Sequence, residues 1–267
     1  MKLQYQKEKI ANFSKVVFSQ NFQQYYGMTN TFKSFEEQNL TNEIKISLLK
    51  KLSVTNHLTV PSFEKFWEWI RKKHGTELSI MLAKFIYPND DANCTGIKNC
   101  MRGNHNHSLW MHIKARVYKK WCSIVTEMQC VYAVVKGIHD KGMNWEVLVS
   151  PELDAIGVDF AIVVPFENGN KVFPIQIKKD SFNPYAQNKY NALDNFDKVP
   201  VKKKQEIELN KELTKQKING EIQEMTILKY GVTSKGDLPY SYLKRYTNGF
   251  VYYDSKILIS ELEKNLF

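Results

Sequence analysis

Apolar side chains recur at three- and four-residue steps between residues 108 and 136, and this is the clearest periodic pattern in the chain. Such spacing places them on one side of an α-helix, so the sequence predicts a long amphipathic helix there. Ser108 can cap its start, and Gly137 is expected to end it. The apolar positions are Leu109, Ile113, Val117, Trp121, Ile124, Val125, Met128, Tyr132 and Val135.

Other segments predict further helices. Residues 62–75 form a helix pattern that Ser62 can cap and Gly75 can end, and residues 255–266 predict a C-terminal helix. Residues 1–60 are polar with helix-like spacing at both ends and an aromatic-rich loop between them. The apolar face of the helix predicted at residues 62–75 is formed by Phe66, Trp69 and Ile70.

Short runs of alternating or apolar residues predict strands. Two of them are joined by residues 167–170, where Asn168-Gly169 is a strong signal for a hairpin turn. A basic helix containing Ile207 and Leu213 is expected later in the chain. The predicted strands are residues 145–149, 158–164, 172–178 and 250–253.

The order of these elements predicts an α/β fold with a mixed central sheet flanked by helices. We expect residues 1–107 to form a helical N-terminal subdomain and a loop, and residues 108–267 to form the α/β domain. The loop at residues 88–108 contains two cysteines and two histidines, which are the usual ligands of zinc. Their spacing matches no common structural zinc pattern, so a polar surface loop is the favoured interpretation and zinc the alternative. The residues concerned are Cys94, Cys100, His105 and His107.

Composition narrows the class of protein. The chain has 267 residues, of which 43% are hydrophobic, so a sizeable core can form. No stretch is apolar enough to span a bilayer, and the N-terminus lacks the apolar region of a signal peptide. We therefore expect a cytoplasmic protein with reduced cysteines and no membrane partner. The net charge of +10 favours a polyanionic partner, with nucleic acid as the first candidate.

Candidate chemistry lies at the two strands joined by the hairpin. Asp154 and Asp159 lie at the entry to the first strand, and the second ends in Gln176-Ile177-Lys178. Because side chains alternate across a strand, Gln176 and Lys178 should share one face. A carboxylate opposite such a pair can hold Mg²⁺ beside a phosphate, so we expect Asp159, with the Ile177 carbonyl, to bind the metal.

The neutral amide of Gln176 stands where a second carboxylate would complete the metal site. We therefore expect another acid to take part, and Asp154 or Glu127 can supply it. Glu127 lies on the long predicted helix and has two interpretations, a solvent-facing glutamate or an accessory acid that leans toward the metal. Lys178 is expected to orient the nucleophile or to stabilise charge on the phosphate.

Basic residues cluster after the second strand and on the long helix. Charge runs are usually solvated surfaces, but this one follows the candidate site directly, so we expect contacts with DNA phosphates. The candidate DNA-binding residues are Arg116, Lys120, Lys179, Lys198, Lys202, Lys203 and Lys204.

The pattern of Asp154 and Asp159, an apolar strand, and then Ile-Gln-Ile-Lys-Lys-Asp at residues 175–180 resembles the TaqI-type type II restriction endonucleases. These are members of the PD-(D/E)xK nuclease superfamily in which Gln replaces the acid. The segments 114–128 and 248–252 are also similar, so the resemblance covers roughly residues 108–255.

The resemblance implies a Mg²⁺-dependent homodimer that cuts both strands of a short palindrome, in that family TCGA cut after the T. It implies essential roles for Asp154, Asp159, Gln176 and Lys178, and a cognate DNA methyltransferase in the same system. The lysine-rich segment from residue 198 onward does not match the family closely enough for any base contact to be assigned to it. Two alternatives stay open from the residues alone: a nuclease of other specificity in repair or mobile-element processing, and a non-catalytic DNA-binding protein.

Overall fold

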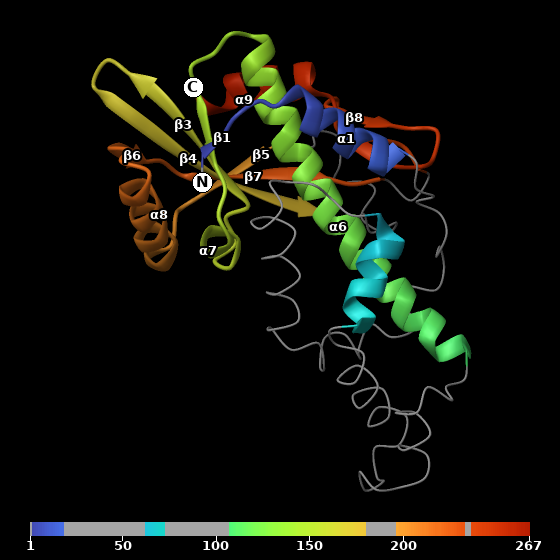
Figure 1. The fold of residues 1–267 in the computed structure, drawn as a ribbon. Coiled ribbons are helices and arrows are strands. Elements are labelled where there is room, and N and C mark those ends of the chain that lie inside the picture. The colour runs from blue at the N-terminus through green and yellow to red at the C-terminus, as the bar shows by residue number, and fades with distance from the viewer. Residues whose placement is uncertain (1, 19–61, 73–106, 180–195, 233–235) are drawn as a thin grey trace, which may run out of the picture.

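The computed structural model describes residues 2–18, 62–72, 107–179, 196–232 and 236–267 (Figure 1). The expectations for Cys94, Cys100 and His105 fall outside these ranges, as does most of the proposed N-terminal subdomain. His107 begins a described helix, but its side chain is outside the description. The division of the chain at residue 107 therefore stays a prediction.

A mixed seven-stranded sheet forms the centre of the fold, in the order β1-β2-β3-β4-β7-β5, with β6 also paired to β4. Strands β3 and β4 are antiparallel, whereas β4 runs parallel to both β6 and β7. The α/β fold predicted from the sequence is confirmed. The strands of the sheet are β1 (Lys2–Leu3), β2 (Glu146–Leu148), β3 (Phe160–Phe166), β4 (Gly169–Lys179), β5 (Phe196–Val199), β6 (Gly220–Ile222) and β7 (Met225–Tyr230).

The β3–β4 hairpin has the predicted turn. Phe166 pairs with Gly169, so only two residues connect the strands. Gly169 has a φ of 117°, a conformation that favours glycine, which explains why Asn-Gly marks this turn. Seven residue pairs join the two strands. This ladder fixes the register between the aspartates before β3 and the Gln-x-Lys motif of β4.

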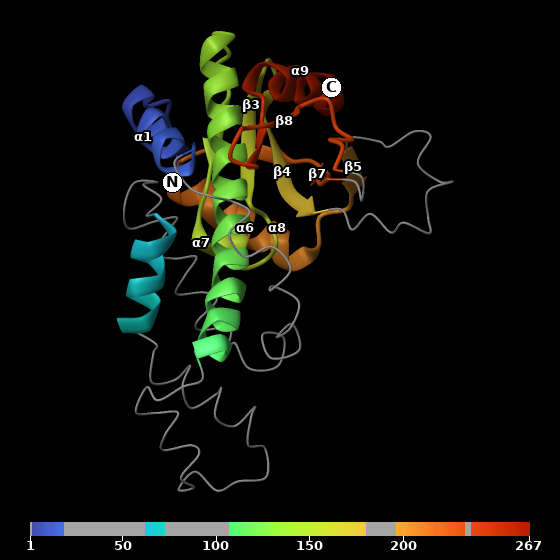
Figure 2. The same ribbon diagram turned by 90° about the vertical axis from the view of Figure 1, so that its right-hand side faces the viewer.

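Helices cover both faces of the sheet (Figures 1 and 2). On one face, α6 (His107–Asp140) and α9 (Ser255–Leu266) pack on side chains that include Ile162 and Ile175. On the other face lie α8 (Lys203–Lys215) and the single turn α7 (Pro151–Asp154). Alternation along each strand divides the apolar side chains between the two cores.

Three segments lie outside the sheet and its covering layers. The helix at residues 63–72 packs on α6, where Phe63 contacts Tyr118 edge-on with ring centroids 4.8 Å apart. Helix α1 (Lys7–Phe18) packs on α6 further along, through Phe13 and Tyr132. A two-stranded sheet of β8 (Leu243–Arg245) and β9 (Val251–Tyr253) follows β7.

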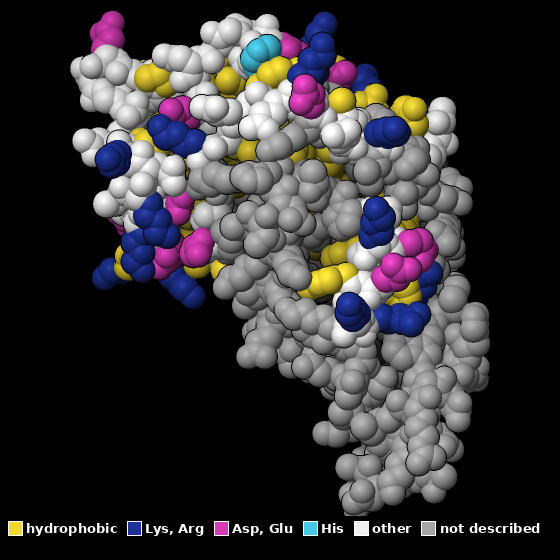
Figure 3. Space-filling view, in the orientation of Figure 1, with side chains coloured by type: hydrophobic (Ala, Val, Ile, Leu, Met, Phe, Trp, Pro, Cys, Tyr) yellow, Lys and Arg dark blue, Asp and Glu magenta, His cyan; other side chains and the backbone are white. Residues whose placement is uncertain are grey.

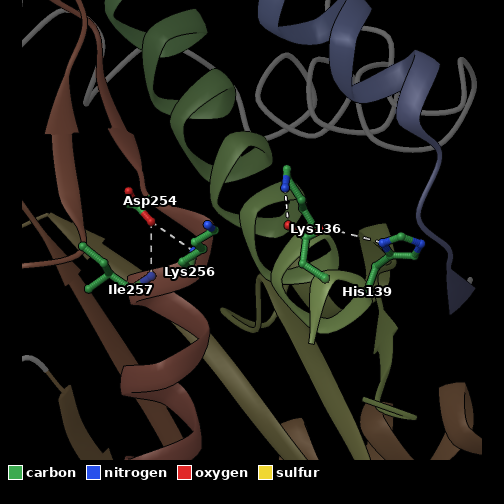
Figure 4. A network of polar contacts seen from close by, with 6 residues as sticks. Lys136, His139, Asp254, Lys256 and Ile257 are labelled. Atoms are coloured by element: carbon green, nitrogen blue, oxygen red, sulfur yellow. Dashed lines mark hydrogen bonds and ion pairs between the residues drawn. The ribbon is translucent and has the colours of Figure 1, made fainter. Parts of the chain in front are cut away.

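The prediction that Gly137 ends the long helix is wrong. Helix α6 continues for one further turn to Asp140. A Cβ on Gly137 would lie 2.7 Å from the Ser255 oxygen and 2.8 Å from Ile259 Cβ, so the glycine lets α9 approach α6 closely. Figure 4 shows this crossing, with Asp254 capping α9 through the amides of Lys256 and Ile257. Near the end of α6, the Asp140 carboxylate accepts a hydrogen bond from Lys136 and lies near the His139 ring. Figure 4 also shows Lys136 and His139 on α6.

Among the described residues, no helix combines the length and the apolar character needed to cross a membrane.

The substitution Gly137→Ala tests the close crossing of α6 and α9. Helix propensity alone predicts a gain of up to about 1 kcal/mol in unfolding free energy. The clash with the Ser255 backbone predicts a net loss of roughly 1–3 kcal/mol, because overpacking a core forces backbone shifts. We expect the loss, measured by urea or thermal unfolding. A variant more stable than the parent would contradict the close crossing.

Candidate active site

Three carboxylates from different elements converge at one end of the sheet. Glu127 comes from α6, Asp154 ends α7, and Asp159 immediately precedes β3. One oxygen from each lies within 4.8 Å of the others, and all three residues are half-buried. Carboxylate oxygens are the preferred ligands of Mg²⁺ and Ca²⁺. The arrangement therefore has the donor set and the charge that a divalent cation requires.

The chain positions Asp154 through a short capped helix. Ser150 Oγ accepts from the Leu153 amide at 3.2 Å, and Ser150 O accepts from the Asp154 amide at 3.1 Å. No helix was predicted here from the sequence, because four residues are too few for a periodic pattern. The Asp154 carbonyl then accepts from Gly157, which closes the turn that leads to Asp159.

Backbone hydrogen bonds to β4 position Asp159. Its own amide donates to the Ile175 carbonyl at 2.9 Å. Its Oδ2 accepts from the Ile177 amide at 2.5 Å, which ties the carboxylate to the strand that carries Gln176 and Lys178. Because Phe160 pairs with Ile175, Asp159 lies opposite Gln176.

Negative charge accumulates at this site. Burial raises the pKa of Asp159 to about 7. The hydrogen bond from the Ile177 amide lowers this pKa, whereas the charge of Asp154 and a hydrogen bond with Asp154 raise it further. Burial also raises the pKa of the Cys130 thiol, and the charges of Asp159 and Glu127 raise it further. The tyrosine at the end of β7, Tyr230, has a raised pKa from burial and from the charge of Glu127. A cation at the triad would offset this repulsion.

Gln176 and Lys178 lie on the sheet face that α8 covers. Gln176 pairs in register with Ile227, whose side chain belongs to the apolar core on that face. Ile177 faces the opposite core, against α6 and α9. The strand register therefore places Gln176 and Lys178 on the same face of the sheet, as predicted. Lys178 is exposed at the end of β4, where its ammonium can reach a bound ligand.

A glycine turn passes directly over Gln176. Gly157 has a φ of 80°, and a Cβ on it would lie 3.1 Å from the Gln176 side-chain nitrogen. Gln205 on α8 holds the same turn, because its Nε2 donates to the Ile156 carbonyl at 3.0 Å and its Oε1 caps the Lys202 amide. The start of α8 is thereby anchored beside the site. Neither Gly157 nor Gln205 was identified from the sequence, because no motif distinguishes them.

The predicted DNA-binding lysines lie on three elements. Lys179 is exposed at the end of β4, and Lys198 is exposed on β5. Lys202, Lys203 and Lys204 are exposed at the start of α8. Figure 3 shows basic side chains gathered over α8, with acidic ones interspersed. The side chains of Arg116 and Lys120 on α6 are outside the description.

Of the two interpretations of Glu127, the geometry favours the accessory acid. Helix α6 packs on the sheet so that Glu127 points to the edge where β3 begins, and its carboxylate joins the two aspartates. Only one feature of the sequence indicated this role, namely that Glu127 is the sole acid in the second half of the predicted amphipathic helix.

The fold and the site together fit a class of protein, the α/β nucleases, because three acids that could hold a divalent cation converge beside the strand that carries Gln176-Ile177-Lys178. The family model described as TaqI restriction endonuclease matches residues 9–266, and the chain belongs to that family. The resemblance seen in the sequence is thus confirmed, and it extends into the N-terminal third. Neither the curated proteins nor the solved structures gave a match.

Gly157→Ala should impair the site with little effect on the cores. The positive φ strains any side chain, at a cost of roughly 1 kcal/mol, and the new methyl would displace Gln176. We expect a lower rate of DNA cleavage at saturating Mg²⁺. Gly142→Ala is the matched control, because Gly142 has a φ of 64° but open space around it. Equal activity losses in both variants would argue against the contact with Gln176.

Asp159→Asn should stabilise the metal-free protein at high pH. The folded carboxyl has a pKa of about 7 against an ordinary 3.8, so the native state binds more protons than the unfolded chain between these values. Stability of the parent therefore falls as pH rises through that window, and the variant escapes this loss.

Asn keeps an acceptor for the Ile177 amide, so the hydrogen bond can survive. With a chelator present, we expect a gain of at least about 1 kcal/mol at pH 8, or roughly 2–4 °C in melting temperature, and little gain at pH 4. Added Mg²⁺ should stabilise the parent more than the variant. A gain that is the same at both pH values would refute the electrostatic explanation.

Proposed function

We propose that this protein is a type II restriction endonuclease that cuts both strands of a short palindromic DNA site with Mg²⁺. The observation that carries the proposal is the convergence of Glu127, Asp154 and Asp159 beside the Gln-x-Lys strand, in a chain of the TaqI restriction endonuclease family. The proposed target is TCGA, cut after the T, which rests on the resemblance alone.

The residues present fit a divalent cation. The donor set is all carboxylate oxygen, and a cation would offset the burial and the Asp154 charge that raise the pKa of Asp159. Asp159, Asp154 and the Ile177 carbonyl would hold Mg²⁺, with Glu127 as the accessory acid. The chemistry that Mg²⁺ supplies when bound is polarisation of the phosphate and activation of water.

Lys178 would stabilise charge on the phosphate and orient the attacking water, because its ammonium lies on the exposed end of β4. Gln176 would orient water or contribute a neutral ligand beside Asp159, its cross-strand neighbour. The Ile177 amide keeps Asp159 in the orientation that the metal needs. These four groups are tied together by the β3–β4 ladder, so a shift of either strand would affect all of them.

DNA binding in this proposal uses the basic surface beside the site. Lys179, Lys198 and the lysines that begin α8 would contact backbone phosphates, with Arg116 and Lys120 contributing from α6. Such contacts position the duplex but do not read its sequence. A homodimer would place one site on each strand of a palindrome, and a cognate methyltransferase would protect the host DNA.

Incubation of plasmid DNA with Mg²⁺ tests the proposal. We expect discrete bands, and sequencing of their ends gives the site and the stagger. A smear would indicate a nuclease without site preference, as in repair or mobile-element processing. Intact DNA would refute the enzymatic function.

Substitutions test the assigned roles in the same assay. Asp159→Ala and Lys178→Ala should each lower cleavage by at least about 10²-fold, since one removes a metal ligand and the other a phosphate contact. Both should retain DNA binding, and Asp159→Ala should bind as tightly as the parent or more tightly, because it removes a negative charge. Glu127→Gln should cut more slowly at low Mg²⁺ and recover in part at high Mg²⁺. Normal cutting by either alanine variant would mean that the catalytic residues are assigned wrongly.

A further inference from the structure

A second lysine lies directly beside Lys178. Strands β4 and β7 are parallel, and Lys178 pairs in register with Lys229. Registered neighbours point to the same face of a sheet. One row earlier on this face, Gln176 aligns with Ile227, whose side chain packs on the α8 side. The ammonium groups of Lys178 and Lys229 therefore both leave the sheet on the face that carries the Gln-x-Lys motif.

Lys229 forms an ion pair with Asp197 of β5. The Lys229 Nζ lies 2.8 Å from Asp197 Oδ1, with side-chain exposures of 17% and 48%. Asp197 pairs in register with Ile227, so it stands on the same face, one row further from the end of the strand. The Lys229 carbonyl accepts from the Tyr242 hydroxyl at 2.6 Å, which fixes the backbone at this end of β7.

Two like charges on neighbouring strands repel each other. Asp197 neutralises one of them, while Lys178 is exposed and has no ion pair within the described part of the chain. An anion between the two ammonium groups would remove the remaining repulsion. Phosphate suits this position, because charged donors form their strongest hydrogen bonds with anionic oxygens.

We propose that Lys229 is a second phosphate-binding lysine of the active site, which Asp197 holds in the DNA-free protein and which a backbone phosphate of bound DNA takes over. The inference rests on the proposed function and adds a residue that no motif indicates. Half of the Asp197 side chain is exposed, so solvent screens the pair and a phosphate can compete for the lysine. Lys229 would then clamp the phosphate that Lys178 contacts, or its neighbour on the same strand.

The contrasting explanation is that the ion pair only joins β5 to β7. The salt dependence of DNA binding distinguishes the two, because removing one lysine–phosphate interaction lowers the slope of log K against log salt by about 0.9. A purely structural ion pair changes the melting temperature and leaves this slope unaltered.

The experiment measures binding of the full-length protein, with Ca²⁺ in place of Mg²⁺, to a duplex of about two helical turns that contains TCGA and to one that lacks it. The variants are Lys229→Gln, Lys229→Arg, Asp197→Asn and the double variant Lys229→Gln with Asp197→Asn. Lys141→Gln is the control, because Lys141 forms a comparable pair with Glu263 at 2.6 Å. Lys141 follows the last residue of α6, about 21 Å along the helix from Glu127.

We expect Lys229→Gln to lower the slope by about 0.9 for each Lys229 that contacts DNA, and Lys229→Arg to retain it. Asp197→Asn should tighten binding, and this gain should be larger with Lys229 present than in the Lys229→Gln background. Lys141→Gln should leave the slope at the parental value.

An unchanged slope in Lys229→Gln, or an Asp197→Asn gain that is equal in both backgrounds, would overturn the inference. If Lys229→Gln folds poorly, the single variant Asp197→Asn still tests the inference, because Asp197 is the more exposed partner and a failure of this variant to tighten binding would also overturn it. Plasmid cleavage by the parent protein separates the two proposals. If the parent cuts DNA and the slope does not change, only the role of Lys229 fails. If the parent neither cuts nor binds DNA, the proposed function fails and the inference with it.

Discussion

The hydrogen bond from the Ile177 amide to Asp159 is the contact on which the site depends. It joins the last residue before β3 to the centre of the Gln-x-Lys motif on β4, at 2.5 Å. Seven cross-strand pairs fix the register that brings the two groups together. A slip of one residue would exchange the faces of Gln176 and Ile177 and separate the acid from the lysine. The apolar strands therefore position the proposed catalytic groups as well as forming the core.

The same contact brings an electrostatic cost into the fold. Asp159 is half-buried beside Asp154, and both its burial and that neighbouring charge raise its pKa. Glu127 from α6 adds a third carboxylate within 4.8 Å. Packing of α6 and α9 on the sheet, with Gly137 at their crossing, has to hold these groups together against their repulsion. Such stored repulsion is what gives a site affinity for a cation, and it explains why the acids lie on three separate elements with rigid supports.

The sequence predicted the parts of the fold that have local signals. The Asn-Gly turn, the alternation around Gln176 and the long periodic pattern of α6 all depend on residues close together in the chain. The β7 partner of β4 was missed, because the pairing of these two strands is parallel and joins residues that are distant in the sequence. Gly137 was misjudged for the same reason: a helix-ending glycine and one that admits another helix have identical local sequence. Gly157 and Gln205 matter through a contact between α8 and the turn before β3, which no spacing rule encodes.

The missed strand changes how the site is understood. With β3 and β4 alone, the site consists of two aspartates, a glutamine and one lysine. Strand β7 extends it on both faces of the sheet, because successive residues point to opposite sides. Lys229 joins Lys178 on the face toward α8, and Tyr230 lies on the other face, where the charge of Glu127 acts on it. The acids are not confined to one face of the sheet, because Glu127 comes from α6, whereas Asp154 ends α7 and Asp159 lies opposite Gln176. In the proposed function, a phosphate approaching this edge would meet both lysines beside the acids that would hold the metal, and the positive charge of lysine and metal together would stabilise the phosphate during displacement.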